Sequence, residues 1–382
     1  MTHFWKWLAV SGVVAGLIYT ALTVLSGFAI PWRSPHFDTA VATTTQRGWV
    51  NEARYFVLNK NVFSEPEDRI VILGASNARD PFRPEIMERS LPDWRVANAS
   101  LSGASIDEIA DAVDLIYLEQ GADPGNRTAF VICLNYIQFI PPSRPEGTDS
   151  PLASEALRGG VHERTEGRLT SRYPRPVERL VSAVFRPQAV AASLPRRTFK
   201  ALFANPELPA VKNFADRFRG DDPLARWVEV IGEHPDLDAV TVPDDVRRAL
   251  MDQRLAGAGG DKALSEAGFR ELAELVALIR SRGDSVVLVD LPLPDWHLAG
   301  VPVTDASYRS GVAEILSRWE GDPAVAALSL REFDDPDNFF DSGHTKPRLW
   351  PVLSRRLAGM IAASSVLSPR TARTEGPSRS DR

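Results

Sequence analysis

Two short segments far apart in the chain carry side chains that could share one proton-transfer reaction. In "VILGASNARD", residues 71–80, an apolar run ends at Gly74 and Ser76 follows it. In "NFFDSGHTKP", Asp341 comes shortly before His344. A serine hydroxyl becomes a good nucleophile when an oriented base takes its proton. We therefore expect Asp341 to orient the imidazole of His344, and His344 to activate Ser76.

The chain has six histidines, and their positions narrow the choice of base. Four lie in N-terminal segments or in a Pro- and Arg-rich region: His3, His36, His162 and His234. His297 follows a predicted strand in "LPLPDWH", but Asp295 is a less natural partner for it along an irregular loop. His344 is therefore the favoured base, and His297 is the alternative.

Apolar runs that are typical of buried strands alternate with amphipathic stretches that are typical of helices. The predicted strands are 69–73, 94–100, 128–134, 285–291 and 325–330. The predicted helices are 105–119, 264–283, 307–319 and 348–362. Strands that are apolar throughout and alternate with helices indicate a parallel sheet covered on both faces. The sequence thus predicts an α/β fold, a three-layer αβα sandwich with a central parallel sheet.

Candidate site residues follow the predicted strands or their immediate turns. They are Ser76, Gly103, Asn135 and the loop 292–297. Ligands of such sheets bind beyond the carboxyl ends of the strands, so these residues should converge at one rim. Each also has a structural alternative, because Ser76 could cap a helix, Gly103 could form a turn and Asn135 could be an ordinary loop residue.

The order of these segments resembles the SGNH (GDSL-type) hydrolase superfamily. A glycine–serine turn follows the first strand, "NASLSGAS" and "ICLNY" follow in the middle, and an Asp-x-x-His precedes the last helix. The resemblance implies that Ser76 is the nucleophile and that Asp341 and His344 are the acid and base. It also implies that Gly103, Asn135 and the N–H of Ser76 form the oxyanion hole.

The resemblance covers 69–134 and 264–362, and two of its motifs depart from the family pattern. The usual Gly-Asp-Ser is Gly-Ala-Ser at 74–76, and the usual Gly-x-Asn-Asp is Cys-Leu-Asn-Tyr at 133–136. Asn135 therefore matches only loosely. Loss of one oxyanion donor typically lowers the rate by about 100- to 1000-fold, so this side chain governs how good an enzyme the chain is.

The N-terminus carries an apolar segment that predicts a membrane anchor at 7–31. No charged residue lies between Trp7 and Trp32, and Lys6 precedes the segment. About 20 apolar residues are enough to span a bilayer. We expect a single-pass protein with a cytoplasmic N-terminus and an extracytoplasmic main domain, held to the bilayer by this helix. The alternative is a cleaved signal peptide, for which "SGFA" offers small residues.

The composition of the chain predicts the boundaries of a stalk, a main domain with an insertion, and a C-terminal tail. Residues 33–66 are polar and lack periodicity, which predicts a stalk. The α/β domain then spans 67–363, with an insertion at 141–260 that could be a lid, a substrate platform or a membrane-facing surface. The arginine clusters of the insertion are also typical of a solvated face. Residues 364–382 have the composition of a disordered tail.

Several classes of function are disfavoured. A net charge of −6 gives no reason to expect a nucleic-acid partner. The single cysteine, Cys133, excludes an internal disulfide, lies in an apolar run and is expected to be a buried, inert thiol. No ligand spacing indicates a metal, and two of the three glycines of a dinucleotide-binding turn are missing at 74–79. No cofactor and no metal are therefore expected.

The expected function is that of a membrane-anchored serine esterase or O-acyltransferase. Its substrate would be an acyl ester of a cell-envelope glycan or a lipid-linked group. This expectation follows from the resemblance, since the chain is similar to membrane-tethered SGNH proteins that modify envelope polymers, some beside a polytopic membrane acyltransferase. The alternative is a non-catalytic SGNH-like scaffold or binding protein for envelope assembly.

Overall fold

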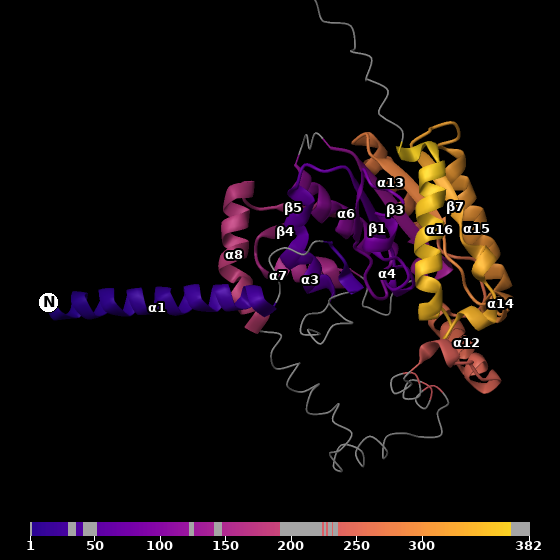
Figure 1. Ribbon diagram of the computed structural model, residues 1–382, viewed down its shortest axis with the longest axis horizontal. Coiled ribbons are helices and arrows are strands. Elements are labelled where there is room, and N and C mark those ends of the chain that lie inside the picture. The colour runs from indigo at the N-terminus through magenta and orange to yellow at the C-terminus, as the bar shows by residue number, and fades with distance from the viewer. Residues whose placement is uncertain are drawn as a thin grey trace, which may run out of the picture.

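The structure is a computed structural model that describes residues 2–29, 36–40, 52–121, 126–140, 147–191, 224, 227, 231 and 236–367. Its centre is a five-stranded sheet in the order β2-β1-β3-β6-β7, with every neighbouring pair parallel (Figure 1). The strands are β1 (Arg69–Leu73), β2 (Arg95–Asn98), β3 (Thr128–Leu134), β6 (Ser285–Asp290) and β7 (Val325–Ser329). The predicted strands are thus confirmed to within a few residues.

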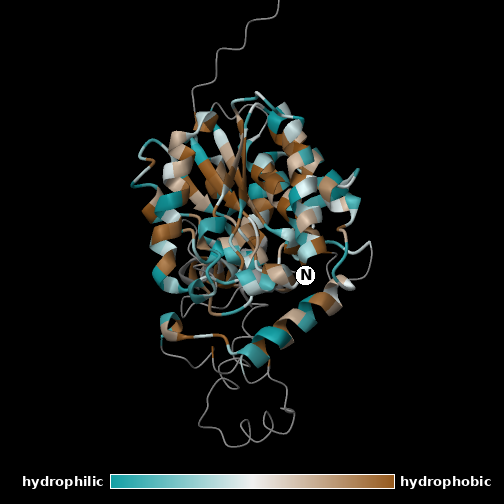
Figure 2. Ribbon diagram, turned by 90° about the vertical axis from the view of Figure 1, so that its right-hand side faces the viewer, coloured by the Kyte–Doolittle hydropathy of each residue, from teal (hydrophilic) through white to brown (hydrophobic). Residues whose placement is uncertain are grey.

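Helices cover both faces of the sheet, as predicted. One face packs on α6 (Ile106–Gln120), α13 (Glu266–Ser281) and α15 (Pro302–Ser317). The other packs on α5 (Pro84–Met87) and α16 (Trp350–Ala363). The strands are mainly hydrophobic between their ends, whereas the helices carry polar residues on their outer sides (Figure 2). This pattern is expected where both faces of a parallel sheet are buried.

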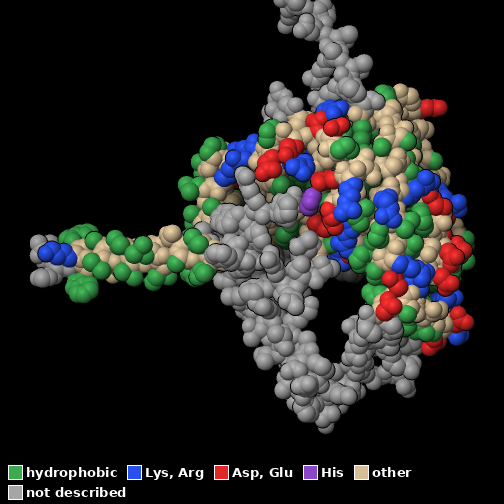
Figure 3. All heavy atoms as spheres, in the orientation of Figure 1, with side chains coloured by type: hydrophobic (Ala, Val, Ile, Leu, Met, Phe, Trp, Pro, Cys, Tyr) green, Lys and Arg blue, Asp and Glu red, His purple; other side chains and the backbone are tan. Residues whose placement is uncertain are grey.

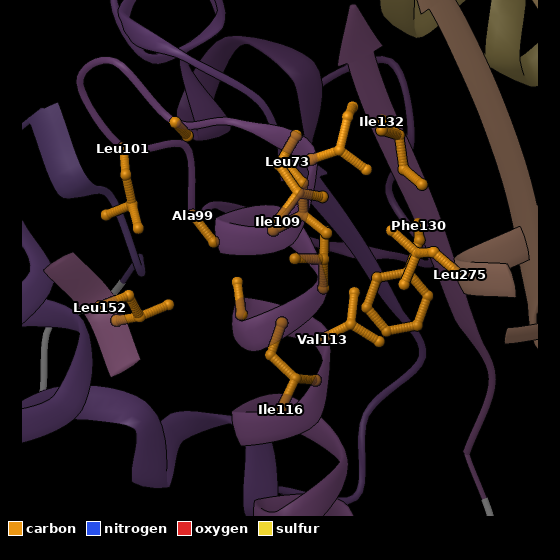
Figure 4. Packing of buried hydrophobic residues seen from close by; sticks show 14 of the residues in the cluster. Leu73, Ala99, Leu101, Ile109, Val113, Ile116, Phe130, Ile132, Leu152 and Leu275 are labelled. Atoms are coloured by element: carbon orange, nitrogen blue, oxygen red, sulfur yellow. The ribbon is translucent and has the colours of Figure 1, made fainter. Parts of the chain in front are cut away.

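Alternate residues of each strand enter two separate cores. On the α6 side, Leu73 and Ile132 face Ile109 and Val113 of the helix (Figure 4). On the opposite side, the fully buried Cys133 packs with the residues that contact α16. Burial raises the pKa of its thiol well above the usual range, so Cys133 is an unreactive core residue, as expected.

Helix α1 (Thr2–Ala29) extends away from the domain. Its stretch Phe4–Leu22 is apolar, and none of it is buried. Hydrophobic side chains cover it on the side shown in Figure 3. The stretch is long and apolar enough to cross a bilayer, and a signal sequence has the same features. Residues 30 and 31 of the predicted anchor lie outside the described residues.

The prediction of a stalk at 33–66 is wrong for its described parts. Residues 36–40 run beside β2, where the N–H of Asn98 donates to the carbonyl of Phe37 at 2.8 Å. Helix α3 (Glu52–Asn59) and the 3₁₀ helix η1 (Lys60–Ser64) add Phe56 and Phe63, both fully buried. The Phe37 ring lies 5.3 and 4.8 Å from these two rings. Aromatic burial therefore folds a segment whose composition is largely polar.

The predicted insertion contains several elements that pack on the domain. They are α7 (Pro151–Arg158), the hairpin β4 (His162–Thr165) and β5 (Arg168–Ser171), α8 (Arg175–Ala191), the 3₁₀ helix η3 (Leu237–Ala239) and α12 (Asp244–Ala258). At the C-terminus, the 3₁₀ turn η7 (Ser365–Leu367) buries Val366, so order extends into the predicted tail. Residues 368–382 lie outside the described part.

We expect Phe56→Ala to lower the free energy of unfolding by about 3–5 kcal/mol, because it leaves a cavity in place of a fully buried ring. Urea unfolding of the detergent-solubilised full chain, followed by tryptophan fluorescence, measures the change. Val303→Ala is the control, since Val303 is 50% exposed. A loss at Phe56 no larger than at Val303 would show that α3 lies outside the cooperative core.

Candidate active site

The turn that presents Ser76 depends on a close approach between β1 and β3. A Cβ on Gly74 would lie 2.8 Å from both the Cys133 carbonyl oxygen and the Ala78 Cβ, so only glycine fits. Ala75 then caps the short helix α4 (Ser76–Arg79), and Ser76 is its first residue. The alternative that Ser76 is the N-cap is therefore wrong. Its hydroxyl is free to face another part of the chain.

The structure brings Ser76, His344 and Asp341 into one hydrogen-bonded chain. The Ser76 Oγ lies 2.7 Å from His344 Nε2, and His344 Nδ1 lies 2.6 Å from Asp341 Oδ2. A carboxylate can only accept, so Nδ1 carries the proton and the neutral imidazole presents Nε2 as an acceptor for the serine hydroxyl. The second carboxylate oxygen of Asp341 accepts the backbone N–H groups of Gly343 and His344 at 2.8 and 2.7 Å.

The charges of this pair shift both pKa values in favour of the ionised forms. Burial opposes protonation of His344, but the charge and hydrogen bond of Asp341 outweigh it, so the pKa of His344 is raised above 6.5. Burial likewise opposes ionisation of Asp341, but His344 and the two backbone N–H groups hold the pKa of its carboxyl below 3.8. The His344 contribution to stability is complete below 6.5 and is lost as the pH rises through the folded pKa. The Asp341 contribution is lost as the pH falls through its own lowered pKa.

Gly103 lies in the loop after β2, beside the Ser76 turn. The N–H of Leu101 donates to the Gly74 carbonyl at 2.9 Å and joins this loop to that turn. Gly103 has a φ of +69° and open space around its Cα. Conformation rather than crowding therefore favours glycine here.

Asn135 is fully buried just after β3, and its side-chain NH2 group makes no hydrogen bond to the described residues. Its Oδ1 accepts the N–H of Ile137 at 2.9 Å, and its own N–H donates to Gln138 Oε1 at 2.8 Å. These bonds cap the 3₁₀ helix η2 (Tyr136–Phe139) and fix the orientation of the amide. Its Nδ2 has no hydrogen-bond partner among the described residues. Because Leu73 and Ile132 are paired, Asn135 and Ser76 follow their strands at the same level.

His297 bonds other residues than Ser76, whose hydroxyl pairs with His344. It is fully buried on α14 (Asp295–Ala299), where Nδ1 donates to the Ser342 carbonyl at 2.6 Å and Nε2 accepts the Tyr136 hydroxyl. Burial lowers the pKa of His297 to about 4, so the ring is neutral. Asp295 is not its partner in these bonds. The ring instead connects the end of β3 to the loop between Asp341 and His344.

Asn98 holds the other end of the helix that carries Ser76. It is fully buried at the end of β2, and its Nδ2 donates to the carbonyls of Arg79 and Phe82 at 3.0 and 2.8 Å. Its Oδ1 accepts the N–H of Ser100 at 3.2 Å. Sequence patterning missed Asn98, although a polar residue at the end of a buried strand was a usable signal.

An ion pair joins α3 to the same rim. The Arg79 guanidinium binds the carboxylate of Glu52 and the Ser102 hydroxyl, and the Glu52 carboxylate also accepts the Ser102 N–H. Arg79 makes a further bond to Asp80 at 2.7 Å. This cluster fixes Ser102, the residue before Gly103. Sequence patterning did not predict the cluster, because Glu52 lies in the segment that was predicted to be a stalk.

The described residues contain no group of three or more His, Cys, Asp or Glu side chains that could hold a metal ion. The chain matches no known protein-family model and no curated protein significantly. The α/β assignment therefore rests on the sheet topology, and the candidate site rests on its own geometry.

We expect Asp341→Asn to lower the pKa of His344, because burial lowers this pKa and the charge and hydrogen bond of Asp341 are the main effects that oppose it. NMR titration of the protein with ¹³C-labelled histidine ring carbons measures this value. Asp295→Asn removes a carboxylate that does not hydrogen-bond to His344 and should leave the value unchanged. Equal titration curves for wild type and Asp341→Asn would contradict the assigned pair.

Proposed function

We propose that the chain is a membrane-anchored serine esterase or O-acyltransferase of the SGNH type. Its substrate would be an acyl ester of a cell-envelope glycan or a lipid-linked group. One observation carries the proposal, namely the continuous hydrogen-bonded chain from the Ser76 hydroxyl through His344 to Asp341. This arrangement supplies a nucleophile, a base and an orienting carboxylate in the order that acyl transfer requires.

The proposed reaction has two acyl-transfer steps. Ser76 Oγ attacks the ester carbonyl carbon while its proton moves to His344 Nε2, and Asp341 stabilises the resulting imidazolium. Collapse of the tetrahedral adduct breaks the ester C–O bond, and the leaving alcohol takes the proton from His344. A second hydroxyl then attacks the acyl-serine and gives its proton to His344, which returns it to Ser76. Water as this acceptor gives hydrolysis, and a sugar or polyol gives transfer.

Three donors are proposed for the negative charge on the tetrahedral adduct. The N–H of Ser76 is at the start of α4, where a helix leaves its first N–H groups without intrahelical acceptors. The N–H of Gly103 lies in the adjoining loop. The Asn135 amide supports the assignment most directly, because its Nδ2 is oriented by the cap and has no partner among the described residues.

The resemblance to SGNH hydrolases supports the same assignment. The serine after the first strand, the glycine after the second, the asparagine after the third and the late Asp-x-x-His follow the order of that family. Asn135 caps η2 even without the usual glycine before it, and its Nδ2 has no partner among the described residues. The unpaired Nδ2 supports the loose match at 133–136 as a part of the site.

Helix α1 is the basis for the cellular location that we propose for the reaction. We propose that this helix remains as a single-pass anchor, with the N-terminus cytoplasmic and the domain outside the cytoplasm. Lys6, just before the uncharged run that begins at Trp7, favours this orientation. A domain tethered to the outer surface of the membrane suits lipid-linked or glycan esters, and a polytopic membrane acyltransferase is a suitable donor of the acyl group.

We expect a fluorophosphonate probe to label the wild-type chain at Ser76, because the probe reacts with a serine whose proton is taken by a neighbouring base. Labelling should vanish in Ser76→Ala and fall steeply in His344→Ala. Gel fluorescence of the purified full chain, with the labelled peptide identified by mass spectrometry, gives the result. Ser317→Ala, on the exposed side of α15, should label like wild type.

Two outcomes separate the proposal from its alternative. Folded wild type that stays unlabelled and does not hydrolyse chromogenic acyl esters would favour a non-catalytic scaffold for envelope assembly. Labelling that persists in Ser76→Ala would place the reactive serine elsewhere.

We expect Asn135→Asp to lower kcat/KM for a chromogenic acyl ester by about 100- to 1000-fold, because it replaces the oxyanion donor with an acceptor. Aspartate is as good a cap as asparagine, so the bond from Ile137 can persist. Gln138→Ala is the matched control, since it removes the other half of the cap and leaves the Asn135 amide in place. Full activity of Asn135→Asp, or an equal loss in Gln138→Ala, would reduce Asn135 to a structural residue.

A further inference from the structure

Helix α8 (Arg175–Ala191) presents an apolar face to the outside of the protein. Val177, Leu180 and Val184 recur at intervals that place them on one side of a helix, and they are 42, 65 and 45% exposed. Tyr173, just before the helix, is 41% exposed. A helix on the surface of a soluble domain normally turns such residues inward, so this face needs an apolar partner.

The inward face of α8 instead carries a buried charged residue, Glu178, which is bound by polar side chains of the domain. Glu178 is 3% exposed, and its carboxylate accepts bonds from Lys60 Nζ at 2.7 Å and from the Ser171 hydroxyl at 3.0 Å. The His162 ring lies 3.2 Å from the same carboxylate. Lys60 is also bound by Glu119 of α6. Because these buried contacts fix the rotation of α8, its apolar residues have to point outward.

The position of α8 identifies the apolar partner. The helix packs against α1 at the side of the domain from which α1 emerges, and it runs across the direction of α1 (Figure 1). If α1 crosses a bilayer, α8 therefore lies in the plane of that bilayer at its surface. Arg179, next to Leu180 on α8, is exposed, as basic residues are in helices that lie among anionic headgroups.

We propose that α8 is an interfacial helix that inserts Val177, Leu180 and Val184 into the surface of the bilayer that α1 spans. The proposal goes beyond the chemistry of Ser76 and rests only on the proposed membrane anchor. A domain held by a single helix can rotate and tilt on it. A second contact fixes the tilt, and it sets the height of the reaction site above the membrane.

Site-specific fluorescence on the full chain tests this placement. The chain is reconstituted into vesicles of phosphatidylethanolamine and phosphatidylglycerol, and the environment-sensitive dye NBD is attached at Val184→Cys or Leu180→Cys. Val303→Cys on α15 is the matched control, being 50% exposed against 45% for Val184. Leu17→Cys reports on α1. The parent chain gives the background, because Cys133 is fully buried.

We expect the dye on α8 to emit at shorter wavelength, to be quenched by a nitroxide placed high on the lipid acyl chain, and to be shielded from aqueous iodide. The dye at Val303 should show the opposite behaviour, and the dye at Leu17 should be quenched by a nitroxide deep in the bilayer.

The remaining outcomes overturn the proposal in distinguishable ways. Quenching at Leu17 with α8 behaving like Val303 would keep the anchor and reject the interfacial helix. Shielding of α8 from iodide without lipid quenching, or shielding only in native membranes, would assign this face to a protein partner instead. No quenching at Leu17 would reject the anchor and the interfacial helix together, whereas the labelling of Ser76 would be unaffected.

Discussion

The hydrogen bond between Ser76 and His344 joins two segments that are 268 positions apart, and the rest of the site depends on holding them together. Neither segment is rigid alone, because Ser76 lies on a single turn of helix and His344 lies in a loop. The parallel sheet brings the two segments to the same place, since the carboxyl ends of its strands meet at one edge. Buried polar contacts then fix each loop to that edge.

Two neutral buried side chains make the most important of these contacts. Asn98 ties the end of α4 to β2, and His297 ties the Asp341–His344 loop to Tyr136 after β3. Both are fully buried. A buried hydrogen bond adds about 1 kcal/mol of net stability. Removing one partner leaves the other buried and unpaired, which lowers stability by more than that amount. These side chains therefore favour one arrangement of the loops over any nearby one.

The sequence predicted the parts of this structure that depend on local patterns. The apolar runs at 69–73 and 128–134 matched β1 and β3, and Asp341 and His344 are close enough in the chain for their spacing to suggest a contact. His297 acts through Tyr136 and Ser342, which are 161 and 45 positions away, so local patterns carried no sign of its role. Asn98 was detectable only as a polar residue at the end of a buried strand, and that position did not name its partners. The stalk prediction failed for a related reason, because Phe37, Phe56 and Phe63 form a core only when distant segments meet.

The segment formed by α3 and η1 contacts both the Ser76 turn and helix α8, which lie far apart in the sequence. At its first residue, Glu52 binds Arg79 and Ser102 beside the Ser76 turn. At the start of η1, Lys60 binds Glu119 and Glu178, the carboxylate that sets the rotation of α8. An ion pair this deeply buried gains little net stability against its desolvation, but it is strongly directional, and a lone charge left in its place is costly. Glu52 and Lys60 of this one segment thus fix the Ser76 turn and α8 relative to each other, while the buried rings of Phe56 and Phe63 stabilise the segment itself.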